Sequence, residues 1–281
     1  MEFSLSEEQE AIFDVAYSFG QENIAPFAIQ WENQGTIPKE LWGKISELGF
    51  GGIYVSEEYG GSGLSRLDAT LIFEALAMAC PSVGSFLSIH NMVGGMIDKF
   101  GSDQNKESFL PDLCSMKKIF SYCLTEPGSG SDASALKTKA TRTNEGFILN
   151  GTKSFISGGA YSNAYLTMTR TGEDGPKGIS AIIIEDPSDG LSFGAFEDKM
   201  GWKAQPTAQV QFDDCRVPSS NLIGDEGYGF TYAMAGLDGG RLNIAASALG
   251  GAQFALESSL TYMNERKAFG KNLNQFQALQ F

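Results

Sequence analysis

The spacing of apolar residues changes twice along this 281-residue chain, and that change limits the possible folds more than any other feature. Up to residue 117 the apolar residues recur at helical spacing, as in the run 66–80, which Pro81 should end. Short segments with strand character follow, and helical spacing returns after Pro218. The expected strands cover residues 119–124, 146–150, 164–170, 179–185 and 208–212.

This order of helical, strand and helical regions predicts an α+β chain with more than one domain. Residues 1–117 should form an N-terminal helical domain, and residues 118–225 a central antiparallel β-barrel or sandwich. Residues 226–281 read as a second helical region, with helices expected at 230–236 and 242–265.

Composition excludes several classes of function. The net charge is −14, from 20 basic and 34 acidic residues, which argues against binding to nucleic acid or to an anionic membrane surface. The four cysteines show no CxxC spacing, and with a single histidine they make neither a plausible zinc set nor a Ser-His-Asp triad. His90 is therefore expected to be structural.

The ends and the hydropathy of the chain indicate its compartment. No apolar run reaches 18 residues, so no transmembrane helix is expected. The first ten residues, MEFSLSEEQE, are acidic, unlike a signal or transit peptide. We therefore expect a cytoplasmic protein of bacterial type. The alternative is the mitochondrial matrix, for a processed protein that carries a start methionine.

The stretch 122–132, YCLTEPGSGSD, leads an apolar strand into a loop of glycine, serine and proline. Pro127 restricts the backbone, whereas Gly128 and Gly130 let the backbone approach a ligand closely. Free N–H groups and hydroxyls on such a loop suit a pyrophosphate. The plainer interpretation is a tight surface turn.

The same loop matches the G-x-G-x-x-A pattern of dinucleotide-binding sites. That pattern requires a helix directly afterwards and an acidic residue about twenty positions further on. Residues 134–143, SALKTKATRT, lack helical apolar spacing, and no acidic residue stands at the required distance. We therefore reject an NAD site of the Rossmann type.

Four motifs in the same order give the chain a resemblance to the acyl-CoA dehydrogenases. They are YCLTEPGSGSD at 122–132, NGTKSFISGG at 150–159, GLDGGRLNIAASALGGA at 236–252 and NERKAFGK at 264–271. Within that family the chain is most similar to the short branched-chain type, through GGSGLSRLDATLIFEALA, SIHNM and GWKAQPT. The resemblance covers essentially the whole chain and implies that residues 226–281 are the first part of a C-terminal helical bundle.

The resemblance implies that FAD is the cofactor and that two segments enclose its flavin. The Thr125 hydroxyl would face the reactive N5 edge, and Phe155 would stand where many relatives have tryptophan. Without the resemblance, Phe155 is a strand core residue and Ser157 a turn hydroxyl. The implied cofactor-binding residues are Tyr122, Cys123, Leu124, Thr125, Glu126, Pro127, Gly128, Ser129, Gly130, Ser131, Phe155, Ile156 and Ser157.

Further residues are implied for the substrate and for a neighbouring subunit. Ser131, Asp238, Gly239, Gly240 and Arg241 would contact the acyl-CoA, although Arg241 is equally compatible with a solvated helix charge. A homo-oligomer, with a tetramer expected, also follows from the resemblance. The residues implied to reach the FAD of the neighbouring subunit are Arg266, Phe276 and Gln277.

The implied reaction is the α,β-dehydrogenation of a short branched acyl-CoA, with isobutyryl-CoA as the best candidate and 2-methylbutyryl-CoA or butyryl-CoA as alternatives. A carboxylate removes the α-proton while the β-hydride moves to flavin N5, and electrons pass to an electron-transferring flavoprotein. A second hypothesis is a protein that binds flavin or acyl-CoA without turnover. The position of the carboxylate base distinguishes the two.

The resemblance implies no base within these 281 residues. Most of the family carry the glutamate in C-terminal helices that would follow Phe281. A minority place it directly before the arginine that matches Arg241, where this chain has Gly240. The chain ends at ALQF inside a helical pattern with no glycine or proline stop. We therefore expect a C-terminally truncated chain, with activity belonging to the complete protein.

Overall fold

The computed structural model describes residues 4–281 and begins with a helical domain. A capping box starts the first helix: the Ser6 hydroxyl accepts a hydrogen bond from the backbone N–H of Gln9, and the Gln9 side chain accepts one from the Ser6 N–H. Pro81 ends one helix and starts the next, as proline at a first helical position does. The helices are α1 (Glu7–Asn23), α2 (Ala28–Gln34), α3 (Lys39–Glu47), α4 (Arg66–Ala79), α5 (Pro81–Phe100) and α6 (Asp103–Cys114).

The central domain is an eight-stranded sheet in the order β6-β7-β3-β2-β4-β5-β8, with β1 paired to β4. Most strand pairs are antiparallel, as expected, but the sheet is mixed, because β1 runs parallel to β4 and β2 pairs in parallel with β4 at one position. The strands β2, β6 and β8 were not predicted. The strands are β1 (Phe120–Cys123), β2 (Lys139–Arg142), β3 (Gly146–Ser157), β4 (Ala164–Arg170), β5 (Ile179–Glu185), β6 (Leu191–Phe196), β7 (Thr207–Pro218) and β8 (Leu222–Ile223).

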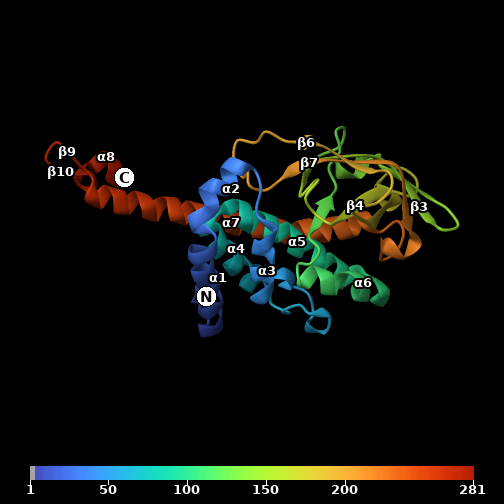
Figure 1. Cartoon of the computed structure of the whole chain (residues 1–281), viewed down its shortest axis with the longest axis horizontal. Coiled ribbons are helices and arrows are strands. Elements are labelled where there is room, and N and C mark those ends of the chain that lie inside the picture. The colour runs from blue at the N-terminus through green and yellow to red at the C-terminus, as the bar shows by residue number, and fades with distance from the viewer. Residues whose placement is uncertain (1–3) are drawn as a thin grey trace.

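One continuous helix, α7 (Gly229–Glu265), replaces the two helices expected after the sheet. Gly239 and Gly240 therefore lie inside the helix, where glycine costs roughly 1 kcal/mol each relative to alanine. Close packing accounts for Gly239, since a Cβ there would overlap the guanidinium of Arg66 on α4. The end of α7 projects from the body of the molecule and carries β9 (Lys267–Ala268), β10 (Lys271–Asn272) and α8 (Gln277–Gln280) (Figure 1).

The face of the sheet formed by β1, β4 and β5 packs on α5, α6 and α7 in one apolar cluster. His90 of α5 lies in this contact, fully buried. Its Nδ1 accepts a hydrogen bond from the Phe120 N–H at 3.0 Å, and its Nε2 donates to the Leu113 carbonyl at 3.1 Å. Burial lowers the pKa of His90 to about 4. The histidine is a structural link between helices and sheet, as its lone occurrence predicted.

Candidate active site

A cavity of about 580 Å³ lies where the ends of β1 and β3 face α5 and α7. It brings together two motifs that stand thirty residues apart in the sequence, 122–125 and 155–157. The predicted residues that line it are Tyr122, Leu124, Thr125, Phe155, Ile156, Ser157, Gly240 and Arg241.

Sequence reasoning missed the part of the cavity wall that α5 and the apolar positions of α7 provide. Ser88, Ile89 and Met92 line it from α5, and Leu237 and Ile244 from α7. The SIHNM stretch supported the resemblance but gave no sign of its position. An apolar helix face looks the same whether it packs in a core or borders a cavity.

Tyr122 supplies an unsatisfied polar group beside the cavity. Its hydroxyl is buried, and within residues 4–281 it has no hydrogen-bond partner. Burial raises the pKa of Tyr122 well above its ordinary value, so the hydroxyl stays protonated at neutral pH. Because buried polar groups in folded proteins nearly always have partners, this hydroxyl is a fitting donor for a bound polar ligand.

Phe155 has an unusual backbone at the opposite wall. Its φ is +57°, in the left-handed region, and its side chain is 66% exposed. The register of β3 against β7 shifts between Lys153 and Ile156, so the residue stands on a bulge. Such bulges redirect side chains, and strain of about 1–3 kcal/mol at a non-glycine residue is typical of ligand-binding sites. An exposed aromatic ring held in this way suits stacking on a planar ligand.

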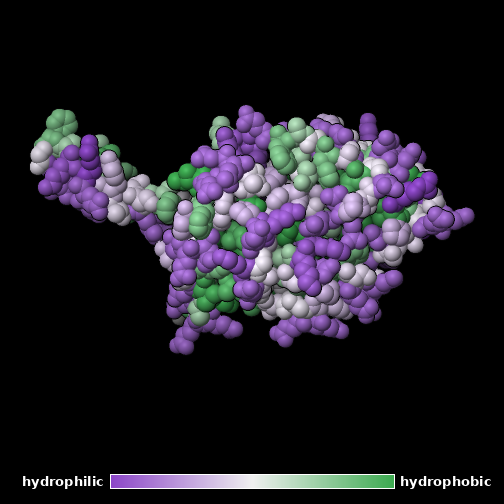
Figure 2. All heavy atoms as spheres, viewed as in Figure 1, coloured by the Kyte–Doolittle hydropathy of each residue, from purple (hydrophilic) through white to green (hydrophobic). Residues whose placement is uncertain are grey.

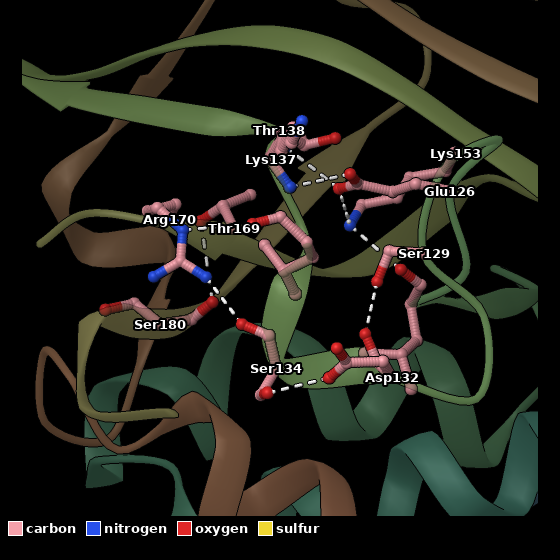
Figure 3. A network of polar contacts seen from close by, with 12 residues as sticks. Glu126, Ser129, Asp132, Ser134, Lys137, Thr138, Lys153, Thr169, Arg170 and Ser180 are labelled. Atoms are coloured by element: carbon pink, nitrogen blue, oxygen red, sulfur yellow. Dashed lines mark hydrogen bonds and ion pairs between the residues drawn. The ribbon is translucent and has the colours of Figure 1, made fainter. Parts of the chain in front are cut away.

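Glu126 does not face the cavity but forms a buried ion pair with Lys153 of β3, at 2.8 Å (Figure 3). Its carboxylate also accepts hydrogen bonds from the backbone N–H groups of Lys137 at 2.6 Å and Thr138 at 2.9 Å. Burial opposes ionisation, but Lys153 and these donors prevail and lower the pKa of Glu126. Burial lowers the pKa of Lys153, and the neighbouring Glu126 carboxylate opposes that shift.

The rest of the glycine-serine loop is anchored at both ends. The Ser129 hydroxyl donates to the Asp132 carbonyl at 2.5 Å. The Arg170 guanidinium donates to the carbonyls of Ser134 and Leu136, at 2.8 and 2.9 Å (Figure 3). A second cavity of about 250 Å³ borders the loop. Pro127, Gly128, Gly130 and Ser131 do not line the main cavity.

Other predicted residues lie away from the main cavity. The Cys123 side chain is fully buried in the core of the sheet. Asp238 is exposed and pairs with Arg241 at 3.2 Å. Arg266, Phe276 and Gln277 lie on the projecting arm, which Figure 1 shows beyond the body of the molecule. The structure thus brings together Tyr122, Leu124 and Thr125 with the 155–157 and 240–241 groups and leaves these others apart.

The described residues, 4–281, contain no cluster of three or more His, Cys, Asp or Glu side chains suited to a metal ion. None of their helices is long and apolar enough to cross a membrane. Among these same residues, those that line the main cavity include no carboxylate.

Three family models match the chain in succession. They are the N-terminal, middle and C-terminal domains of acyl-CoA dehydrogenase, at residues 6–117, 121–215 and 227–281. The mitochondrial isobutyryl-CoA dehydrogenase of Dictyostelium discoideum is 54% identical over 99% of this chain and 67% of the relative. The corresponding Bos taurus protein is 50% identical over the same shares of both chains.

Solved structures give the same result for the fold. Butyryl-CoA dehydrogenase from Megasphaera elsdenii superimposes with a TM-score of 0.95 at 38% identity, over 100% of this chain and 75% of that one. A structure described as the FAD complex of PigA has a TM-score of 0.94 at 32% identity, over 100% of this chain and 74% of that one. The helical, sheet and helical arrangement of this chain is therefore shared with flavin-binding proteins.

Proposed function

Because this chain belongs to the acyl-CoA dehydrogenase family, we propose that its main cavity holds the flavin of FAD beside a short branched acyl-CoA, which is oxidised to the α,β-unsaturated thioester. One observation carries the proposal. Tyr122, Leu124, Thr125 and residues 155–157, which the family resemblance assigned to the flavin, line the same cavity together with Gly240 and Arg241.

The residues present fit a flavin. The unsatisfied Tyr122 hydroxyl, the Thr125 side chain and the exposed Phe155 ring provide a polar edge and an aromatic wall for a planar ring system. When bound, FAD accepts the hydride released from the substrate β-carbon. Thr125 would orient the ring by a hydrogen bond from its hydroxyl, and Phe155 would cover one side and exclude water. Water exclusion strengthens every polar contact inside the cavity.

The substrate proposed first is isobutyryl-CoA, after which the two relatives at 54% and 50% identity are named. Ile89, Met92 and Ile244 give the helical side of the cavity an apolar surface for a short branched acyl group. A hydrophobic pocket discriminates one methylene by only about 1–3 kcal/mol, so 2-methylbutyryl-CoA and butyryl-CoA should react more slowly rather than not at all. Arg241 is the proposed partner for CoA, with Gly240 leaving room for the thioester.

The proposed partners are an electron-transferring flavoprotein and further copies of this chain, with a tetramer as the assembly. One solved structure that this chain resembles, with a TM-score of 0.96, is described as an electron-transferring flavoprotein of Acidaminococcus fermentans. The arm that carries Arg266, Phe276 and Gln277 projects from the body of the molecule, which supports the proposal that it meets a neighbouring copy (Figure 1). The proposed compartment is either the bacterial cytoplasm or the mitochondrial matrix, since both isobutyryl-CoA dehydrogenases above are named mitochondrial.

A binding protein without turnover is the second candidate, because no carboxylate lines the cavity within residues 4–281. Removal of the α-proton requires such a base within hydrogen-bond reach. Titration of the folded 281-residue chain with FAD, followed by anaerobic addition of isobutyryl-CoA, tests both candidates. We expect FAD uptake and an acyl-CoA-dependent change of the flavin spectrum, without bleaching at an enzymatic rate.

Other outcomes of this experiment are equally informative. A folded protein that remains colourless with excess FAD would show that the cavity is not a flavin site. Bleaching at an enzymatic rate would show that a base lies within these residues. A series of acyl-CoAs from C4 to C12 then tests the substrate, and stronger binding or faster reaction at C8 or longer would contradict the short-chain proposal.

A further inference from the structure

Lys153 is a charged residue with no exposed side-chain surface, in the strand that forms one wall of the cavity. Its ammonium donates to Oε1 of Glu126 at 2.8 Å (Figure 3) and also to the Leu124 carbonyl at 3.0 Å. A buried ion pair costs several kcal/mol per ion in desolvation, and apolar residues of similar volume often stabilise a fold equally well. Stability alone therefore does not explain this pair.

The contacts of Lys153 and its neighbour surround Thr125. Lys153 binds the carbonyl of Leu124 and the carboxylate of Glu126, the residues on either side of Thr125. The backbone N–H of Ser154 donates to the Thr125 carbonyl at 2.8 Å. Three consecutive residues of the 122–131 loop are thus fixed to two consecutive residues of β3.

The same segment of β3 determines where Phe155 points. Lys153 and Ser154 precede Phe155, and the register shift against β7 begins at Lys153. The Glu126 carboxylate also accepts hydrogen bonds from the backbone N–H groups of Lys137 and Thr138. The segment that follows the loop is therefore fixed to the same carboxylate. The Glu126–Lys153 ion pair therefore connects three segments: the 122–131 loop, residues 137–138 that follow it, and the bulge of β3 that carries Phe155.

We propose that Glu126 and Lys153 are positioning residues of the flavin site, which set the Thr125 hydroxyl and the Phe155 ring at a fixed separation and angle across the cavity. The inference rests on the proposed function for its ligand, but the coupling of the two walls is a property of the protein without FAD. Neither side chain contacts the flavin. Both act through the backbone of Leu124, Thr125 and Phe155.

The decisive variant is the double substitution Glu126→Gln and Lys153→Met. The glutamine keeps one of the two oxygens, so it can accept from the N–H of Lys137 or of Thr138 but not from both. The methionine keeps roughly the length of lysine without its charge. We expect a cooperatively folded protein in which hydrogen exchange of the FAD-free chain speeds up in segments 122–131 and 152–158 together. The FAD dissociation constant should rise about ten- to hundredfold, which corresponds to one or two lost charge-assisted hydrogen bonds.

Lys118→Met is the matched control, since Lys118 pairs with Glu185 at 2.7 Å but both side chains are more than a third exposed and lie outside the cavity lining. It should change neither exchange in the two segments nor FAD affinity. The inference would be overturned if the folded double variant exchanged at the same rate as the parent, or if exchange became faster in only one of the two segments. If the double variant does not fold, Glu126→Gln alone decides by the same exchange measurement. If the parent takes up no FAD, the proposed function fails while the exchange result still decides this inference.

Discussion

The two walls of the main cavity are built in different ways. The wall from the β-domain is held by buried polar contacts, with Glu126 and Lys153 at their centre. The wall from α5 and α7 is mostly apolar, and Gly240 lets the two helices approach closely, since a Cβ there would lie only 3.1 Å from Sδ of Met92. Polar networks specify one geometry, whereas apolar packing tolerates change of shape. We infer that the β wall determines the orientation of the cofactor. The helical wall determines which acyl group the cavity accepts.

The space-filling view extends this contrast to the surface. Figure 2 shows many hydrophilic residues on the visible face of the body, with smaller hydrophobic areas between them. Apolar and polar residues alternate along the projecting arm (Figure 2). Large exposed apolar side chains on the arm include Phe254, Leu256, Leu260, Phe269 and Phe281. Their exposure agrees with the proposal that the arm meets another copy of the chain, whereas both cavity walls described above come from a single copy.

The largest expected effect comes from giving the helical wall the carboxylate that it lacks. Gly240→Glu places a glutamate directly before Arg241, which is the position that a minority of the family use for the base. A positioned general base contributes about 10²–10⁴-fold to a rate. We expect anaerobic flavin bleaching by isobutyryl-CoA in the FAD-loaded Gly240→Glu protein, at least about a hundredfold faster than in the parent, measured by stopped flow.

Gly240→Gln is the matched control, because it adds the same volume near Met92 without a carboxylate. Equal bleaching rates for the Glu and Gln variants would show that position 240 does not face the substrate α-carbon. A loss of FAD binding in both variants would instead show that the apolar helical wall does not tolerate the added side-chain volume. That result would contradict the contrast drawn between the two walls.

The second effect tests the β wall by breaking its ion pair on one side only. Lys153→Met leaves the Glu126 carboxylate buried without its cation, and such a change costs about 3–5 kcal/mol. Urea unfolding should show this loss, while Lys118→Met costs less than about 1 kcal/mol because its pair is partly exposed. Restoring most of the stability with the additional change Glu126→Gln would support the explanation. A single-variant cost below that of Lys118→Met would contradict it.

The third prediction concerns His90, which joins the two walls through α5 and β1. Its pKa of about 4 in the folded protein lies below the unfolded value near 6.5, so folding favours the neutral ring. The stabilisation is complete above pH 6.5 and is lost as the pH falls towards 4. Between about pH 7.5 and pH 5 the parent should lose about 2 kcal/mol of unfolding free energy.

Urea unfolding of the parent and of His90→Gln at both pH values checks this prediction. The variant should be less stable at the higher pH, because glutamine does not reproduce both backbone contacts of the imidazole. It should also lack most of the decrease towards the lower pH. A decrease of the same size in both proteins would assign the effect to other groups, such as the carboxylates with lowered pKa.

The two walls also differ in how many of their residues could be identified from the sequence. The β wall was found because its residues form contiguous motifs, 122–125 and 155–157, that a family resemblance identifies. Lys153 was missed, since a lysine in a strand normally marks a solvent-facing position. The helical wall depends on which residues of α5 face the cavity, and that is fixed only when α5, α7 and β1 pack together.

Errors in the fold have similar causes. The alternation of apolar and polar residues identifies strands but not their direction, so the parallel pairing of β1 with β4 was not predictable from it. The strand β2 is mostly exposed, with Ala140 as its one buried residue. The strand β6 lies at the edge of the sheet, and none of its residues is fully buried. The continuity of α7 through Gly239 and Gly240 depends on contacts with α4 and α5, which local helix propensity does not contain.

The smallest effect expected is that of one hydroxyl in the β wall. Thr125→Val keeps the shape of the side chain and removes a donor that we place against the flavin. The Thr125 carbonyl accepts its hydrogen bond from the Ser154 N–H through the backbone, so the loop should keep its position and the unfolding midpoint should not change. A single hydrogen bond contributes about 1 kcal/mol, which predicts about fivefold weaker FAD binding and a shifted flavin band. Fluorescence titration and absorption spectra measure both. Unchanged affinity and spectrum in the Thr125→Val protein, beside a large loss in the Glu126 and Lys153 double variant, would mean that the wall holds the flavin through its backbone alone.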